Sequence, residues 1–300
     1  MARDLEPVES KPLCMRSVSR ETLDLSCPAR LTAAASPGLA GLAVDALLAE
    51  IDLYPKPGLV SPVDTGSHHD MDCGLMRTSA ESLREPFSRI AGAAAAGAAF
   101  ESGLVPLGVE AERRMLEVTG GVNTHRGAIF AMGLLVSATA LAGIGAGPDT
   151  VRTVLLEAWG PALLRHARSD ARVGARWEAA AGYPSLFERA LPHYRHRLQE
   201  GFAADAAAIE TLFLLIASVS DTNLIHRGGS KGAAFARGRA RDFLGSGGIA
   251  GKDWKPRAIG IHAEFVERNL SPGGAADLLA GTLFIHRTCA AEEFPVVKEA

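Results

Sequence analysis

Apolar residues in this chain recur at helical spacing, and runs that alternate apolar and polar residues, as in β-strands, are nearly absent. The clearest helical segment begins at Ser36-Pro37, an N-cap followed by proline at the first helical position, and ends before Pro55 and Pro57. We therefore predict an all-α protein. Further helices are expected near residues 79–100, 109–118, 124–141, 150–167, 204–219, 230–243, 256–269 and 275–288.

The chain shows no long polar linker that would separate two domains. Apolar residues make up 47% of its 300 residues, which is enough for a large core. The segment 1–35 mixes prolines with scattered charges, and we predict a loosely ordered leader there. Residues 36–292 are predicted to form a single multi-helix globular domain, all-helical and catalytic.

The net charge of −3 argues against a general nucleic-acid or membrane-surface binder. The N-terminus carries acids and has no apolar core of a secretory signal. The four cysteines form no CxxC pair, which is typical of free thiols in a reducing compartment, so we predict a cytoplasmic protein. Residues 128–147 carry no charge and are long enough to span a bilayer, but they are rich in Ala and Gly and lack aromatic belts. A buried core helix is the preferred interpretation.

Polar side chains are concentrated in three islands, at residues 50–72, 120–130 and 220–232, each beside an apolar helical run. Glycine and proline punctuate all three. An active site assembled at helix ends and Gly/Pro turns is the interpretation that fits this pattern.

The first island combines acids, a lysine and histidines. Glu50 falls at a helix C-terminus, where the dipole disfavours an acid, so a metal or a basic partner is expected, the alternative being a solvated helix end. Lys56 stands between two prolines and could meet a phosphate, although a lone lysine is more often a surface residue. His68 could act as acid, base or phosphate donor. Oxygen ligands for Mg²⁺ are available from Asp64, Asp70 and Asp72, unless the turn is merely hydrated and an Asp caps the next helix.

The second island predicts an anion site. Asn123 is a suitable N-cap, and His125 and Arg126 follow in the first turn of an apolar helix. Cations there are unfavourable to the helix dipole, which favours a bound anion over a plain glycine turn.

The third island follows another apolar helix. Asn223 and Arg227 lie four residues apart and share a face if the helix continues, and Arg227 suits bidentate phosphate binding. Gly228, Gly229 and Lys231 lack the spacing of a phosphate loop. The segment Ser271–Gly274 opens the last helix, with Asp277 in its first turns, and it fits a plain helix start as well as a substrate role.

Taken in order, these segments resemble the triphosphoribosyl-dephospho-coenzyme A synthase family. The resemblance covers about residues 39–287, and His69 and Arg126 stand where the family more often has lysine. The matching strings are E-x4-PKPGLV at 50–60, GSHHDMD at 66–72, GGVNTHRGAIF at 120–130, RWEAAAGYP at 176–184, DTNLIHRGG at 221–229 and SPGGAADLLA at 271–280.

The resemblance implies a reaction. The family transfers the triphosphoribosyl unit of ATP to the 2′-hydroxyl of 3′-dephospho-coenzyme A and releases adenine. The product is the precursor of the prosthetic group on the acyl carrier subunit of malonate decarboxylase or citrate lyase, and it passes to a holo-acyl carrier protein synthase. Because the chain stands alone and is rich in Ala and Arg, we favour malonate decarboxylase over citrate lyase.

The resemblance also implies roles for the polar residues, without assigning each one uniquely. Acid, base or charge-stabilising roles fall to Glu50, His68, Asp70 and Glu178. Substrate binding is expected from Lys56, Asn123, His125, Arg126, Asn223 and Arg227. Inferred Mg²⁺ would be held by Glu50, Asp70 and Asp221.

Two other classes compete with this interpretation. A metal-dependent His-Asp phosphohydrolase is suggested by the HHD string and the distant Asp221, but the first strong helix lacks an upstream metal-binding His. A helical adaptor without activity would not need so many polar residues at glycine turns. The sequence does not predict an oligomeric state.

Overall fold

The computed structural model describes residues 36–167 and 174–289, and these ranges contain helices and no β-strand. The all-α prediction is confirmed, while the predicted leader lies outside the described residues. The longer helices are α1 (Ser36–Ile51), α2 (Cys73–Ser82), α3 (Arg84–Ala95), α4 (Val105–Val118), α5 (Arg126–Ala142), α6 (Pro148–His166), α8 (Leu191–Gln199), α9 (Ala204–Ser218), α10 (Thr222–Gly245), α11 (Trp254–Glu267) and α12 (Gly273–Cys289). Shorter elements are the π-helices η2 (Phe100–Leu104) and η3 (Ser185–Ala190), the helix α7 (Ala175–Ala180) and the 3₁₀ turn η4 (Gly248–Ala250).

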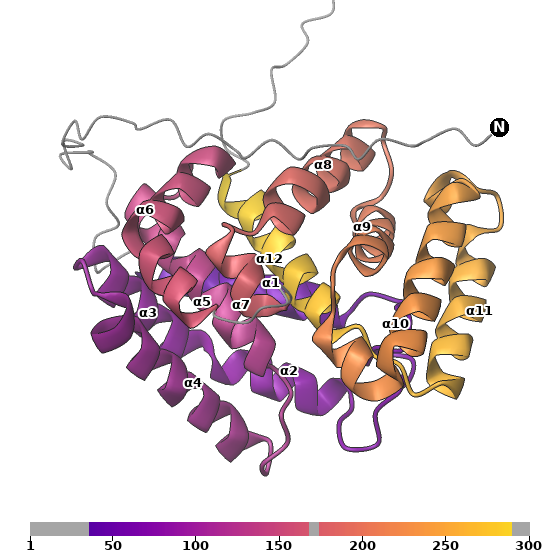
Figure 1. Ribbon diagram of the computed structural model, residues 1–300, viewed down its shortest axis with the longest axis horizontal. Helices are drawn as coiled ribbons and strands as arrows, with labels where there is room; N and C mark the ends of the chain where they lie inside the picture. The colour runs from indigo at the N-terminus through magenta and orange to yellow at the C-terminus, as the bar shows by residue number, and fades with distance from the viewer. Residues whose placement is uncertain (1–35, 168–173, 290–300) are drawn as a thin grey trace, which may run out of the picture.

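Helices α5 and α12 pack against each other at the centre of the molecule, and α1 packs against both (Figure 1). Helix α3 lies against α1 and α5, and α6 covers another side of α5. Helix α9 joins α12 to α10, and α10 and α11 lie side by side at one edge. Because α5 and α12 are apolar nearly all round, they are enclosed on every side by other helices.

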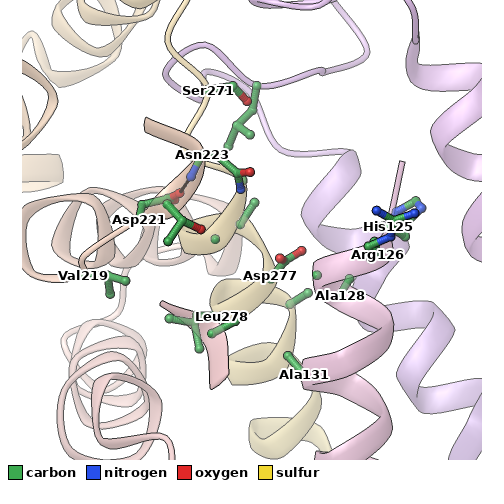
Figure 2. Close-up of a pocket in the computed structure, with 18 of the residues that line it drawn as sticks. His125, Arg126, Ala128, Ala131, Val219, Asp221, Asn223, Ser271, Asp277 and Leu278 are labelled. Carbon is green, nitrogen blue, oxygen red and sulfur yellow. Dashed lines mark hydrogen bonds between the residues drawn. The ribbon is translucent and has the colours of Figure 1, made fainter. Parts of the chain in front are cut away.

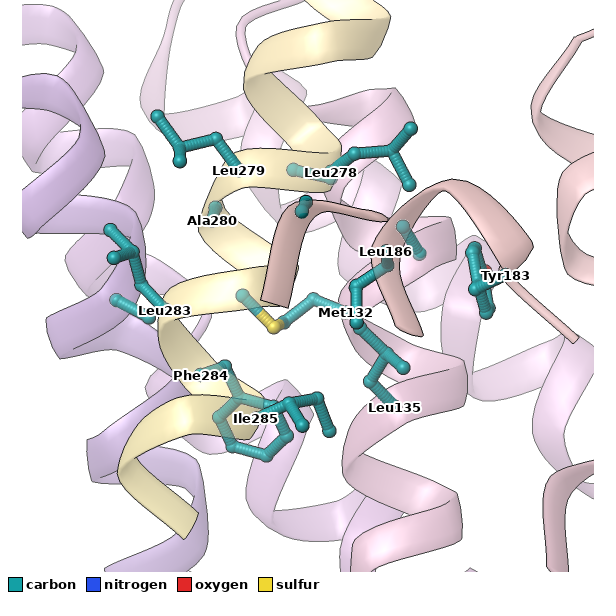
Figure 3. Packing of buried hydrophobic residues seen from close by; sticks show 14 of the residues in the cluster. Met132, Leu135, Tyr183, Leu186, Leu278, Leu279, Ala280, Leu283, Phe284 and Ile285 are labelled. Carbon is teal, nitrogen blue, oxygen red and sulfur yellow. The ribbon is translucent and has the colours of Figure 1, made fainter. Parts of the chain in front are cut away.

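The contact between α12, α5 and η3 is close because α12 has glycine where they meet. A Cβ added at Gly281 would lie 2.8 Å from Leu135 Cδ1 and 3.0 Å from Leu186 Cδ1. Met132 of α5 and Phe284 of α12 fill the adjoining space (Figure 3). Interiors are packed to crystal density, so removing a side chain here would leave a cavity rather than a rearranged core.

Most predicted helices are present, but one predicted helix is split and two further helices were not predicted. The segment predicted as one helix at 79–100 is split between α2 and α3 at Leu83. The Ser82 hydroxyl donates to the Ser79 carbonyl, and the Leu83 N–H bonds Ala80 three residues back, so the chain tightens and turns. The helices α7 and α8 were not predicted, because Pro184, Pro192 and many charged residues interrupt the apolar spacing of that region.

Helix α10 contains a break. Gly229 has φ +63° and ψ −166°, so Thr222–Gly245 consists of two helical segments joined at this residue. The second segment begins where a helix was predicted, at Ser230. The first segment contains Asn223 and Arg227 in consecutive turns, as their spacing required.

No single helix in the described ranges is long and apolar enough to cross a bilayer. Helices α9 and α10 satisfy length and composition only as a pair bent by 61°. The uncharged segment at 128–147 contains most of α5, which is a buried core helix as predicted.

Candidate active site

The three polar islands meet at a cavity of about 750 Å³, which we call the polar cavity. Its walls come from the C-terminal end of α1, the loop after it, and the first turns of α5, α7, α10 and α12 (Figure 2). The residues to which the family resemblance gave roles all line this cavity. They are Glu50, Lys56, His68, Asp70, Asn123, His125, Arg126, Glu178, Asp221, Asn223 and Arg227.

Glu50 and Lys56 form a buried ion pair at the end of α1. The Lys56 Nζ donates to Glu50 Oε1 at 2.9 Å and to the backbone carbonyls of Glu50 at 2.7 Å and Ile51 at 3.3 Å. Lysine near a helix C-terminus satisfies carbonyls that have no intrahelical partner. Lys56 is 1% exposed and its three donors are all used, so its first task is to fix the loop on α1.

His262 of α11 holds the same loop from the other side. Its Nδ1 lies 2.6 Å from the Lys56 carbonyl and 3.3 Å from the Gly58 N–H, and its Nε2 lies 3.2 Å from Asp64 Oδ1. Asp64 Oδ1 also accepts from the Gly66 N–H at 2.9 Å, and Asp72 caps α2 by accepting from Leu75. Among the aspartates of the first island, Asp64 and Asp72 are therefore occupied by local structure, and only Asp70 lines the cavity.

His68 links the first island to the third. Its Nδ1 lies 3.2 Å from an Arg227 amine and its Nε2 lies 2.9 Å from Ser271 Oγ. Because arginine only donates, Nδ1 accepts, and Nε2 carries the proton toward Ser271. Burial lowers the pKa of His68, and the Arg227 charge lowers it further, although Asp70 at 3.7 Å opposes this. The structure thus favours a neutral imidazole with a fixed tautomer.

Arg227 also donates to the Ser67 carbonyl and to Asn269 Oδ1, both at 2.8 Å. Asn269 has a φ of +53°, a left-handed turn in which its amide reaches the guanidinium. Arg227 therefore joins three segments that are distant in sequence, and part of its charge faces the cavity.

The start of α5 carries the second island. Asn123 Oδ1 accepts from the Arg126 N–H at 3.2 Å, but the N-cap residue of α5 is His125 and not Asn123, because the helix begins only at Arg126. His125 is buried, with Nδ1 2.9 Å from Ser79 Oγ. Burial lowers the pKa of His125 to about 4, and the Lys56 charge acts in the same direction. Arg126 is half-exposed, and its Nε pairs with Glu112 at 3.1 Å.

Asp221 connects the starts of α10 and α12. Its Oδ1 accepts from Asn223 N at 2.8 Å and from Leu224 N at 3.4 Å, and its Oδ2 accepts from Ala275 N at 3.0 Å. Burial raises the pKa of Asp221 despite these donors. Gly273 lies against the Asn223 side chain of the third island, because a Cβ at Gly273 would be only 2.7 Å from the Asn223 amide.

Glu178 and Tyr183 line another side of the cavity. Glu178 Oε1 accepts from the Ser185 N–H at 2.7 Å, and burial raises its pKa. Tyr183, absent from the sequence-based set, is buried at a left-handed φ of +51°, and its hydroxyl has no hydrogen-bond partner in the described residues. An unpaired buried hydroxyl at a strained position is typical of a functional site.

Asp277 of α12 is the second residue that sequence analysis did not select. It lies beside the first turn of α5, between Asp221 and Ala128 (Figure 2), and no described group hydrogen-bonds to its carboxylate. A Cβ at Gly127 would overlap that carboxylate, so the THRG string needs glycine to admit it. Burial raises the pKa of Asp277 well above its usual range, and Asp221 and Glu50 act in the same direction. The sequence feature that could have identified Asp277 is an acid in the second turn of an otherwise apolar helix.

The inferred metal ligands do not form a cage. Glu50 is paired with Lys56, and Asp221 accepts backbone N–H groups, while Asp70 is exposed at the cavity edge. Within residues 36–167 and 174–289, no three His, Cys, Asp or Glu side chains form a group able to hold a metal ion. The donors present therefore do not fit a resident metal held by these three carboxylates.

Helix starts that gather acids, histidines and arginines around one polar cavity define a helical enzyme of the nucleotide-binding kind. The family of ATP:dephospho-CoA triphosphoribosyl transferases matches this chain over residues 37–166 and 160–295. The chain belongs to this transferase family.

Curated relatives extend over most of the chain. A probable 2-(5″-triphosphoribosyl)-3′-dephosphocoenzyme-A synthase of Stutzerimonas stutzeri is 38% identical over 282 residues, covering 89% of this chain and 97% of the relative. A probable synthase of the same name from Azotobacter vinelandii is 40% identical over 263 residues, with 83% and 90% covered. The 2-(5″-triphosphoribosyl)-3′-dephosphocoenzyme-A synthase of Klebsiella pneumoniae is 38% identical over 263 residues, with 83% and 94% covered. No solved structure matches the chain.

Proposed function

We propose that this transferase moves the triphosphoribosyl unit of ATP to the 2′-hydroxyl of 3′-dephospho-coenzyme A and releases adenine. The names of its relatives support the reaction. The observation that carries the proposal is the meeting of all three polar islands at one cavity of about 750 Å³. That volume is within the range of about 300–1,000 Å³ found for ligand pockets.

The chemistry needs an acid close to the reacting sugar. The bond between the ribose anomeric carbon and adenine breaks, a bond from that carbon to the acceptor oxygen forms, and the hydroxyl proton ends on adenine. Positive charge develops at the anomeric carbon, as in glycoside hydrolysis, and a nearby carboxylate stabilises it.

The carboxylates lining the polar cavity differ in their availability for this role. Asp277 has no described hydrogen-bond partner, whereas Glu50 is paired with Lys56 and Glu178 accepts from Ser185. We assign this place to Asp277, whose raised pKa favours the protonated acid: it would donate a proton to the leaving adenine and then, as the carboxylate left behind, stabilise the positive charge. Glu178 and His68 are the candidates that take the proton of the acceptor hydroxyl, and Glu50 is the anchor of Lys56.

The triphosphate has to be held throughout the reaction, because it stays on the ribose. The start of α5 offers backbone N–H groups and Arg227 supplies charge, while Arg126 lines the cavity where it can meet either the triphosphate or the diphosphate of the acceptor. Asn123, His125 and Asn223 add neutral polar contacts. Lys56 contributes the field of a buried cation while its donors remain on α1.

Mg²⁺ is proposed to enter as the complex with ATP, where it would neutralise phosphate charge. Magnesium in such complexes keeps water and phosphate ligands and needs only one or two protein carboxylates. Asp70, at the cavity edge, is the candidate ligand among the three predicted from the sequence.

The proposal includes a biological setting. The prosthetic-group precursor of malonate decarboxylase is favoured over that of citrate lyase, because the composition is rich in Ala and Arg. The product would pass to a holo-acyl carrier protein synthase. A cytoplasmic location is supported by the free thiol of Cys73 and by the use of ATP.

The test is incubation with ATP, Mg²⁺ and 3′-dephospho-coenzyme A, with chromatography of the bases and mass analysis of the products. Free adenine and a triphosphoribosylated acceptor are expected in equal amounts. Coenzyme A, whose 3′-phosphate crowds the 2′-hydroxyl, should be a poor acceptor. Release of ADP, AMP or phosphate without adenine would instead support the phosphohydrolase alternative.

A further inference from the structure

A second cavity of about 370 Å³ lies among α3, η2, α4, α5 and α6, and the proposed chemistry does not use it. We call it the apolar cavity because Phe100, Leu104, Phe130, Leu134 and Leu163 are among its lining side chains. Its volume is also within the usual range for ligand pockets. A packed interior rarely leaves such a space without a ligand to fill it.

The two cavities lie on opposite sides of one wall. On α5, Ala128 and Ala131 line the polar cavity, whereas Ile129 and Phe130 line the apolar cavity. Helix α7 divides in the same way, with Trp177 on the polar side.

Charged side chains lie at the edge of this wall, between the two cavities. Arg176 lines the apolar cavity from the start of α7. Arg126 lines the polar cavity and pairs through Nε with Glu112, which lines the apolar one. Its four other N–H groups are not used by that bond. A ligand that passes from one cavity to the other would therefore meet arginine at the crossing.

The acceptor has the shape that such a pair of spaces requires. Its reacting ribose must meet the ribose of ATP in the polar cavity, so ATP and the adenosine end of the acceptor share that space. A diphosphate then leads to an uncharged, amide-containing chain that ends in a thiol. Two arginines suit the diphosphate, and an apolar cavity beyond them suits the chain.

We infer that the apolar cavity between α4 and α5 binds the pantetheine arm of 3′-dephospho-coenzyme A, an inference that rests on the proposed function. Val105 and Val109, 38% and 61% exposed, lie at its edge on α4 and leave apolar surface that the arm would cover. The site thus selects an acceptor by its arm, at a distance from the bond that forms.

Gly108 gives a direct test. It lines the apolar cavity, and a Cβ added there meets nothing within 4 Å, so Gly108→Trp can place an indole in the space without displacing backbone. The KM for dephospho-coenzyme A should rise about tenfold or more, a loss of about 1.4 kcal/mol or more in binding. The KM for ATP and the turnover at saturating acceptor should stay the same.

A binding measurement separates the arm from the rest of the acceptor. ADP is dephospho-coenzyme A without its arm, so calorimetry on both ligands gives the arm's share of the affinity. That difference should be present in the wild type and lost in Gly108→Trp, while Gly238→Trp, at an equally open helical glycine outside both cavities, should keep it. If the indole disturbs folding, Val109→Trp at the exposed edge takes its place.

Two failures are distinguishable. A wild type that releases no adenine contradicts the proposed function itself. A wild type that makes the product, together with blocked variants that keep the full preference for dephospho-coenzyme A over ADP, overturns the inference about the apolar cavity. An equal loss for ATP and acceptor would also overturn it, because the substitution would then have disturbed the shared wall.

Discussion

The carboxylate of Asp277 lies in the polar cavity without a described hydrogen-bond partner, and the negative charges of Asp221 and Glu50 act on it. We expect Asp277→Asn to lower turnover by about a hundredfold, the usual effect of losing a group that acts on the transition state. Stability should be unchanged or higher, because a buried acid near Asp221 and Glu50 is replaced by a neutral group of the same shape. Steady-state kinetics and a thermal melt measure both effects.

Two controls separate chemistry from folding. Asp72→Ala removes the side chain that caps α2 outside the cavity, so it should lower stability by about 1 kcal/mol and leave turnover unchanged. Gly127→Ala should reproduce the turnover loss, since the added methyl overlaps the Asp277 carboxylate, whereas Gly92→Ala, with its nearest neighbour at 3.8 Å, should not. Near-normal turnover in Asp277→Asn would remove this residue from the mechanism.

Arg126 is a cation in the first turn of α5, where the dipole disfavours it, and it pairs with Glu112 across the surface. We expect Arg126→Ala to raise the KM for one anionic substrate about tenfold or more, and Arg126→Lys to keep most of the function. Stability should change by less than about 1 kcal/mol, because exposed pairs contribute little. Kinetics with each substrate varied in turn identify which anion is affected.

Glu112→Gln is the matched variant for Arg126, because it removes the same ion pair and leaves the cation. If Arg126 binds an anion, the KM should stay constant or fall when Glu112 is neutralised. A structural role predicts that both variants lose the same stability and that neither changes affinity.

At the level of the elements, the break in α10 sets the direction of its first segment. Gly229 has a φ and ψ that are open only to glycine, and nothing lies within 4 Å of its Cβ position. Gly229→Ala should therefore cost about 1–3 kcal/mol through backbone strain alone. We also expect weaker substrate binding, because the segment with Asn223 and Arg227 must turn.

Gly238→Ala tests the same helix where its backbone is regular. It should raise stability by about 0.5–1 kcal/mol, since alanine loses less conformational freedom than glycine. Chemical denaturation of both variants gives the comparison. Equal effects at the two positions would mean that the break is not strained for alanine.

The sequence predicted the elements well where apolar spacing was regular, as in α1, α5, α9 and α12. It also located the polar islands, because acids and cations at glycine turns stand out against an apolar background. The sequence did not distinguish side chains that hold the structure together from side chains free to act on a substrate, because that difference depends on partners distant in the chain. Lys56 reads as a phosphate ligand until its three acceptors on α1 are seen, and Tyr183 reads as core until its hydroxyl is found unpaired.

For the whole molecule, His125 ties folding to pH. The pKa of His125 is about 4 in the folded protein, whereas the ordinary value for histidine is 6.5. Folding therefore favours the neutral imidazole. The stabilisation by neutral His125 is fully present at a pH above the pKa of the unfolded chain. It is lost as the pH falls toward the pKa of His125 in the folded protein. From about pH 7 to about pH 5 the wild type should lose about 2 kcal/mol of unfolding free energy through this residue.

The contribution of His125 has to be measured as the difference between two proteins, because other groups also make the unfolding free energy depend on pH. Asp221, Glu178 and Asp277 have raised pKa values, so they increase stability as the pH falls. Denaturant titrations of the wild type and of His125→Gln at several pH values isolate it. The difference in unfolding free energy between the wild type and His125→Gln should become smaller as the pH falls from about 7 to about 5. A constant difference over this range would contradict the lowered pKa of His125.

The carboxylate of Asp221 is a counterion, built into the protein, for the positive ends of two helix dipoles. This carboxylate occupies the starts of both α10 and α12, the position that a phosphate takes where nucleotides bind at helix N-termini. Helix α5 has no acid at its start: its N-cap residue His125 makes no side-chain cap bond, and the neutral Asn123 amide accepts from the Arg126 N–H. A polyanion entering the cavity would therefore meet two helix starts that already hold a carboxylate and one that does not, which orients the polyanion before any side chain selects it.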